Sequence, residues 1–269
     1  ITKLWNVARF AERFLADACR GEAAPPASSP DNTIEGSMVL AVKGSARAAS
    51  PLRSPQQLSP ADRWILARTQ RLIRRVTALF RDYDYAAAKS EIETFFWRDL
   101  ADNYLEMAKL RLYNEDAGAA FTVDHVLLAT LKLFAPFLPH VTEAIYQALF
   151  AERDGAMSIH VSQWPQPDAR FADDAAGAFG ETLVEIATAV RRYKSERGLS
   201  LGAEVGPLLL GTRDVTLAEH CRAAAQDLVS VTRAQRVEVV GALDGEGILL
   251  LDDAIQVALM PQLSASAGS

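Results

Sequence analysis

The chain has 269 residues, 49% of them hydrophobic and 23% charged, which is enough for one or two domains with a buried core. A net charge of −6 excludes a general nucleic-acid binder, but residues 1–81 hold 13 Lys or Arg against 6 Asp or Glu, a local net charge of +7. No apolar run approaches the roughly 20 residues of a membrane span, no signal peptide opens the chain, and the two cysteines have neither disulfide nor zinc-site spacing. The composition therefore predicts a cytoplasmic protein.

The N-terminal part predicts a helix followed by a long connection. Residues 1–20 form an amphipathic pattern whose apolar side chains fall on or near one face, namely Leu4, Val7, Ala8, Ala11, Phe14 and Leu15. Over residues 21–60 the composition changes to Pro, Ser, Ala and Gly, which predicts a long flexible connection with one short strand over 38–42.

The next part predicts further helices with mostly short links. Ser59 and Pro60 are typical of a helix start, and the apolar period continues to about Asp82. A third helix is expected over 85–113, a fourth from Thr122 to an interruption at Pro136, and a fifth over 139–155. The sequence therefore predicts a mainly α fold, an antiparallel helical bundle over residues 1–165.

The pattern changes after Trp164 and Pro165. A helix over 173–197 is followed by a strand at 205–210, a helix at 217–225 and alternating runs at 236–240, 248–251 and 255–260. This order predicts a small α/β domain over 166–263, and residues 264–269 are expected to form a disordered tail.

Several motifs fall in order along the chain and resemble one known family. They are KLWN with ARF at residues 3–10, ADRWIL at 61–66, FFWRDLADNYLEMAK at 95–109, APFLPHVTE at 135–143, and SIH to WP at 158–165. Together they resemble the anticodon-binding helical bundle of class I aminoacyl-tRNA synthetases, in the valyl type, with the isoleucyl type as an alternative. The chain also begins without Met inside a predicted helix, so we expect it to be a C-terminal fragment of such a protein.

The resemblance implies a function for the chain. It implies a module that recognises the anticodon loop and stem of a valine-accepting tRNA and positions this tRNA for ATP-dependent aminoacylation by a catalytic domain that the chain lacks. The HIGH and KMSKS motifs are missing, so no catalytic residue and no cofactor are expected here, while ATP and Mg²⁺ belong to the parent's catalytic domain. The expected partners are tRNA and the catalytic and editing domains, with neither DNA nor a membrane.

The basic N-terminal part supplies the candidate tRNA-binding residues. Arg68, Arg71 and Arg75 share one helix face, where guanidinium groups either contact RNA or are neutralised within the bundle by Asp99 and Asp102. Trp64 is read either as a stacking platform for an unpaired anticodon base or as a core residue. The resemblance further implies four residues near the loop-binding surface: Asn6, Arg9, Arg63 and Trp64.

Asp99 and Asp102 lie on the most distinctive segment, and structural ion pairing with arginines is the favoured interpretation of both. A metalloenzyme using these residues with Glu106 is a weaker alternative, because no histidine lies on that helix and no metal site is expected. A third possibility is a helical scaffold, descended from a synthetase, that binds a protein and no RNA.

Overall fold

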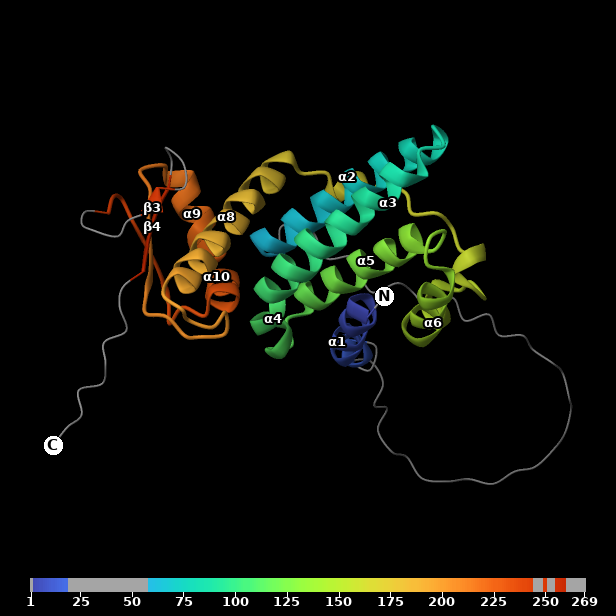
Figure 1. The fold of residues 1–269 in the computed structure, drawn as a ribbon, viewed down its shortest axis with the longest axis horizontal. Coiled ribbons are helices and arrows are strands. Elements are labelled where there is room, and N and C mark those ends of the chain that lie inside the picture. Colours follow the sequence, from blue (N-terminus) through green and yellow to red (C-terminus); the bar gives the residue numbers. More distant parts are fainter. Residues whose placement is uncertain (1, 19–57, 244–248, 251–254, 260–269) are drawn as a thin grey trace, which may run out of the picture.

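The computed structural model describes residues 2–18, 58–243, 249–250 and 255–259, and Figure 1 shows a helical bundle joined to a smaller C-terminal unit. Most of the predicted connection over 21–60, the strand predicted within it and the tail from residue 264 lie outside the described residues. Within them, the predicted mainly α fold with a small α/β part is confirmed.

The bundle consists of long helices joined by short links, as its apolar periodicity indicates. Its main elements are α1 (Thr2–Ala18), α2 (Pro60–Arg81), α3 (Tyr85–Thr94), η2 (Phe95–Tyr104), α4 (Leu105–Tyr113), α5 (Ala117–Phe134) and α6 (Pro139–Leu149). The short elements α7 (Ala151–Asp154), η3 (Ile159–Val161) and η4 (Ala169–Phe171) follow. Capping residues define two of the starts, because Ser59 and Asp62 form a capping box for α2 and Asp116 caps α5. The Asp116 cap places the start of α5 at Ala117, earlier than Thr122.

The helix predicted over 85–113 forms, but its middle third, η2, is a π-helix, which periodicity alone does not indicate. At its end, the Leu105 amide donates to the carbonyl of Leu100, five residues earlier. Within η2, Asp99 is buried, whereas Trp97 and Arg98 are exposed. π-Helical turns often mark functional sites, but here the observed contacts of η2 are with α1, α2 and α8 (Asp174–Glu196).

The C-terminal unit is a four-stranded sheet with helices. Its elements are the strands β1 (Leu208–Gly211), β2 (Val237–Val240), β3 (Leu249–Leu250) and β4 (Gln256–Leu259), with the helices α9 (Val215–Ala223) and α10 (Ala225–Thr232). The strand order is β2-β1-β4-β3, in which β1 pairs parallel to β2 and antiparallel to β4. The parallel pair needs a crossover, which α9 and α10 provide.

The helix α8 begins beside α2 and ends in the C-terminal unit, so it links the two parts (Figure 1). The sequence assigned this helix to the domain beyond residue 165, and that boundary stays a prediction.

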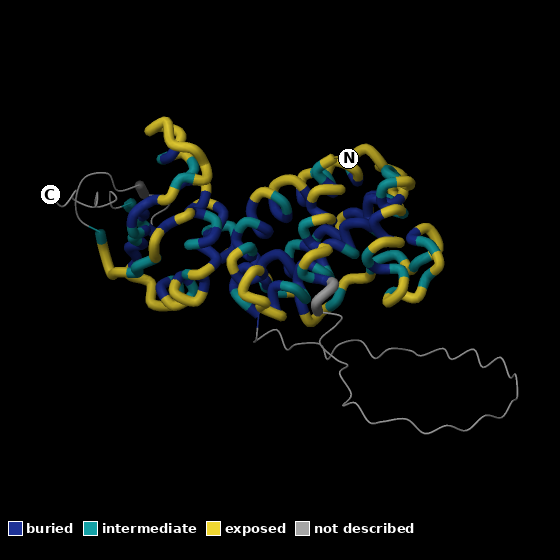
Figure 2. The backbone as a smooth tube through the Cα atoms, turned by 90° about the horizontal axis from the view of Figure 1, so that it is seen from below, coloured by how far each residue is buried: buried dark blue, intermediate teal, exposed yellow. Residues whose placement is uncertain are grey.

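The buried residues lie along the middle of the bundle, and the exposed residues lie on its outside (Figure 2). Helix α5 is long and apolar enough to cross a membrane by length and composition, but 61% of that stretch is buried inside the fold. It packs against α1, α2, α4 and α6, which is the position of a core helix. Cys221 is buried and forms no disulfide within the part of the chain that the structure describes.

Candidate nucleic-acid interface

The arginine row of α2 lies against acidic side chains of the protein itself. Arg68 Nη2 lies 2.8 Å from Asp99 Oδ2 of η2. Arg71 Nη2 lies 2.9 Å from Asp174 Oδ1 at the start of α8. Arg75 Nε lies 3.6 Å from Glu91 Oε1 of α3.

The Arg71 pair forms because α8 runs antiparallel to α2 along the face that carries these arginines. Asp174 contacts Arg71, and Gly180, further along α8, lies against Trp64, nearer the start of α2. The three arginines remain partly exposed, but each already has a carboxylate partner. The geometry therefore favours neutralisation within the protein for this row, and its contact with RNA stays a prediction.

The structure corrects one of the two interpretations of Trp64. Its side chain is 0% exposed and fills the space between α2 and α8, so the indole has no face on which an RNA base could stack. The α8 helix covers a position that would otherwise lie at the surface of the bundle. Arg63, the neighbouring candidate, is half-buried, and its Nε has no hydrogen-bond partner among the described residues.

The outward face of α1 differs from that of α2. Asn6 and Arg9 are exposed here together with Trp5 and Arg13, while the apolar side chains of α1 pack on α5 and α6. Neither Arg9 nor Arg13 forms an ion pair within the part of the chain that the structure describes. A shallow hollow of about 200 Å³ lies along this face and is lined by Asn6, Arg9, Phe10 and Arg13. We call the set Trp5, Asn6, Arg9 and Arg13 the α1 face.

Asp99 and Asp102 have different partners. Asp99 is buried against Arg68, and burial raises the pKa of its carboxyl although the arginine opposes this shift. Asp102 is exposed and pairs with Lys3 of α1 at 2.5 Å, so its partner is a lysine of another helix. The described residues contain no group of three or more His, Cys, Asp or Glu side chains that could hold a metal ion, so no metal step is derived.

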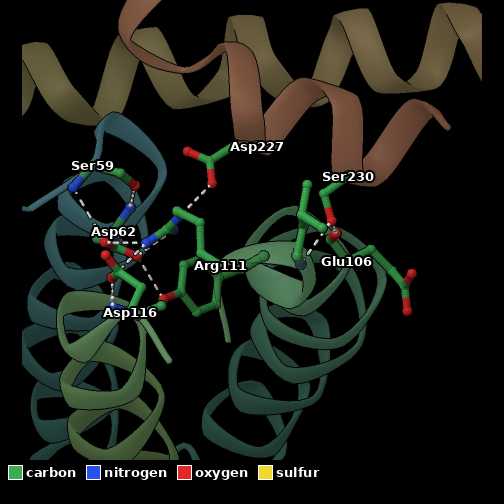
Figure 3. A network of polar contacts seen from close by, with 10 residues as sticks. Ser59, Asp62, Glu106, Arg111, Asp116, Asp227 and Ser230 are labelled. Atoms are coloured by element: carbon green, nitrogen blue, oxygen red, sulfur yellow. Dashed lines mark hydrogen bonds and ion pairs between the residues drawn. The ribbon is translucent and has the colours of Figure 1, made fainter. Parts of the chain in front are cut away.

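A buried polar network joins the bundle to the C-terminal unit (Figure 3). Arg111 of α4 donates through both terminal nitrogens to the carboxylate of Asp62, at 2.9 and 2.8 Å, and through Nε to Asp227 of α10, at 2.7 Å. The Tyr104 hydroxyl donates to Asp62 Oδ1 at 2.7 Å. Burial raises the pKa of Asp227 to about 6, although Arg111 lowers it.

Further polar contacts fix the same junction. Ser230 of α10 donates to the Glu106 carbonyl at 2.6 Å and accepts from the Leu110 amide at 3.2 Å (Figure 3). Arg191, near the end of α8, donates to Asn103 Oδ1 and to the Asp102 carbonyl of η2. Lys194 is buried and donates to two carbonyl oxygens of the C-terminal unit. Arg191 therefore ties α8 to η2 of the bundle, and Lys194 ties it to the C-terminal unit.

Two sets of residues were missed by sequence reasoning. Trp5 was detectable, because a tryptophan on the polar side of an amphipathic helix stands out on a helical projection. Arg111 and Asp227 lie far apart in the sequence, and no local pattern indicates that they meet in the core.

The chain is similar in sequence to known tRNA ligases. A family profile described as the anticodon-binding domain of tRNA ligase matches residues 62–209. The chain is 39% identical to the valine–tRNA ligase of Methanopyrus kandleri over 245 residues, which is 88% of this chain and 23% of that protein. It is 34% identical to the Thermococcus kodakarensis valine–tRNA ligase over 244 residues, 89% of this chain and 24% of that protein.

A bacterial relative agrees with these two. The valine–tRNA ligase of Rickettsia rickettsii is 35% identical over 207 residues, 73% of this chain and 24% of that protein. The chain thus spans about a quarter of the length of the relatives it matches. These relatives are of the valine type that the motifs indicate.

Proposed function

The chain belongs to the family of anticodon-binding domains of tRNA ligases, and from this premise we propose that it binds the anticodon arm of a valine-accepting tRNA through the α1 face. The observation that carries the choice of surface is the contrast between two rows of arginines. Arg68, Arg71 and Arg75 of α2 have carboxylate partners, whereas Arg9 and Arg13 have none among the described residues. Unpaired guanidinium groups suit phosphate oxygens, and the Asn6 amide suits a base edge.

The rest of the reaction takes place in other parts of the parent protein. In this proposal the chain holds the anticodon end while a catalytic domain uses ATP and Mg²⁺ to attach valine to the other end of the tRNA, in the cytoplasm. The proposal places ATP and Mg²⁺ in that catalytic domain.

The test is equilibrium binding of the full chain to a valine tRNA transcript over a series of salt concentrations. We expect Arg9→Ala and Arg13→Ala each to weaken binding and to reduce the slope of log K against log salt by about 0.7–0.9 if one phosphate contact is lost. Arg71→Ala is the matched control, since this arginine is 42% exposed but pairs with Asp174, and it should leave the slope unchanged.

Two results would decide against the proposal. If the folded chain bound no tRNA even at low salt, the chain alone would not be a tRNA-binding module. If Arg71→Ala reduced the slope while Arg9→Ala and Arg13→Ala did not, the interface would lie on α2. A transcript with an altered anticodon then measures specificity, and weaker binding to it is expected if the loop bases are read.

A further inference from the structure

Trp5 is exposed at a position where an amphipathic helix usually carries polar residues. Its side chain is 39% exposed, whereas Leu4, one residue earlier, is 2% exposed and packed in the core. At 100° per residue, Trp5, Arg9 and Arg13 are spaced by four residues and form one stripe along α1. The stripe is therefore an aromatic ring followed by two cations.

The other three tryptophans of the chain are either buried or in contact with a polar side chain of the protein. Trp64 is 0% exposed, Trp97 lies under the ammonium group of Lys3 at 4.1 Å, and Trp164 donates from Nε1 to Thr77 at 2.9 Å. Within the described ranges, no aromatic ring, cation or hydrogen-bond partner engages the Trp5 ring. Trp97 is also exposed, at 46%, but the Lys3 ammonium group lies over its ring. Trp5 is thus the exposed tryptophan whose ring has no such partner among the described residues.

The charge beside Trp5 favours RNA as that ligand. Arg9 and Arg13 carry two positive charges on the stripe, and Glu12 is the acidic side chain next to them. Among the described residues neither arginine has a carboxylate partner, Glu12 included, which leaves both guanidinium groups available for an anion. An exposed indole with adjacent arginines suits a single-stranded nucleic acid, in which a base stacks on the ring and the flanking phosphates contact the cations.

We infer that Trp5 is the stacking platform for one unpaired base of the anticodon loop, with Arg9 and Arg13 on the flanking phosphates. This inference rests on the proposed function and adds to it the residue that distinguishes a loop from a duplex. Paired bases are stacked on each other within a helix, so a duplex offers no free base to the indole. Trp5 therefore takes the stacking role that Trp64, buried under α8, is unable to fill.

The experiment compares two RNA probes on the full chain and its variants: the anticodon stem-loop of a valine tRNA, and a duplex of the same stem without a loop. Loss of one stacked base weakens binding by about 5- to 150-fold, so Trp5→Ala should lower stem-loop affinity by that factor and leave duplex affinity unchanged. Trp5→Phe should retain most of the affinity. The salt slope of Trp5→Ala should equal that of the unmodified chain, because no phosphate contact is lost.

Tyr85→Ala is the matched control, since this ring is 47% exposed at the first residue of α3. The tip at which α2 leads into α3 lies away from α1 (Figure 1). It should leave binding to both probes unchanged. A 2-aminopurine placed in the loop gives a second readout, and its fluorescence should be quenched by the unmodified chain and by Trp5→Phe but not by Trp5→Ala.

The outcomes separate this inference from the proposed function. If Trp5→Ala bound the stem-loop as tightly as the unmodified chain while Arg9→Ala weakened it, the α1 face would still bind tRNA and stacking on Trp5 would be refuted. If Trp5→Ala weakened both probes equally, its effect would not be base stacking and the inference would also fail. If the folded, unmodified chain bound neither probe, both proposals would be overturned.

Discussion

Gly180 is the position at which the close approach of α8 to α2 is most directly tested. A Cβ placed here would lie 1.9 Å from Cγ and Cδ1 of Trp64, whereas ordinary van der Waals contact begins at 3.4 Å. The substitution Gly180→Ala must therefore separate the two helices by roughly 1.5 Å, the difference between these distances, or displace a side chain that is 0% exposed. The atoms that a Cβ would meet are the ring and Cβ of Trp64, and not the far end of a flexible side chain that could move aside.

The expected magnitude follows from two opposing terms. Overpacking a well-packed core costs about 1–3 kcal/mol, occasionally more, and a contact with the ring and Cβ of a buried tryptophan belongs to the upper end. Alanine is favoured over glycine inside a helix by up to about 1 kcal/mol, which offsets part of this cost. We expect Gly180→Ala to lower the free energy of unfolding by about 2 kcal/mol.

Urea denaturation, followed by circular dichroism, measures this change, and Gly177→Ala is its matched control on the same helix. The nearest atom to a Cβ at Gly177 is Nη2 of Arg71, at 2.7 Å, and this end of a flexible side chain moves easily. Gly177→Ala should leave stability unchanged or raise it by up to about 1 kcal/mol. Equal effects at the two glycines would refute the reasoning, as would a Gly180→Ala cost that persists in a Trp64→Leu background, where the clash is removed.

Two further predictions concern the buried network. Arg111→Met leaves the carboxylates of Asp62 and Asp227 buried without their cation, so it should lower the free energy of unfolding by about 3–5 kcal/mol. The control Arg98→Met removes an exposed arginine and should lower it by less than about 1 kcal/mol. Equal losses of the two variants in urea denaturation would contradict this difference. The folded-state pKa of Asp227 is about 6, above its ordinary 3.8, so the folded chain binds the proton first and this carboxyl adds stability as pH falls through about 6. Asp227→Asn should remove that contribution, so the variant should become less stable relative to the unmodified chain as the pH falls from 7 to about 4. A stability difference that does not depend on pH would rule out titration of Asp227.

The network also explains why the C-terminal unit and the bundle pack closely. Asp62 and Arg111 belong to the bundle, and Asp227 belongs to the α10 helix of the C-terminal unit. A buried charge needs its partners in place, so this junction restricts the orientation of one part relative to the other. Ser230 adds backbone contacts to α4, and Arg191 adds contacts to η2.

Local patterns predicted most of the fold because helix formation depends on residues near in sequence. The Ser59 cap, the apolar period of α2, the apolar run of β1 and the alternation in β4 each indicated the correct element. The start of α5 was placed late, since the cap at Asp116 lies before the strongly apolar part of the helix. The π-helical winding of η2 was not predicted, because its register depends on contacts with α1, α2 and α8.

The sequence by itself determined the mainly α fold, the family of the chain and the presence of exposed cations on α1. It did so because periodicity, caps and family motifs are written in neighbouring residues. The tertiary structure alone decided which cations remain available, since the partners of Arg68 and Arg71 come from η2 and α8, distant in the chain. It also decided which tryptophan is the candidate for base stacking, because α8 buries Trp64 while Trp5 on α1 is exposed to solvent.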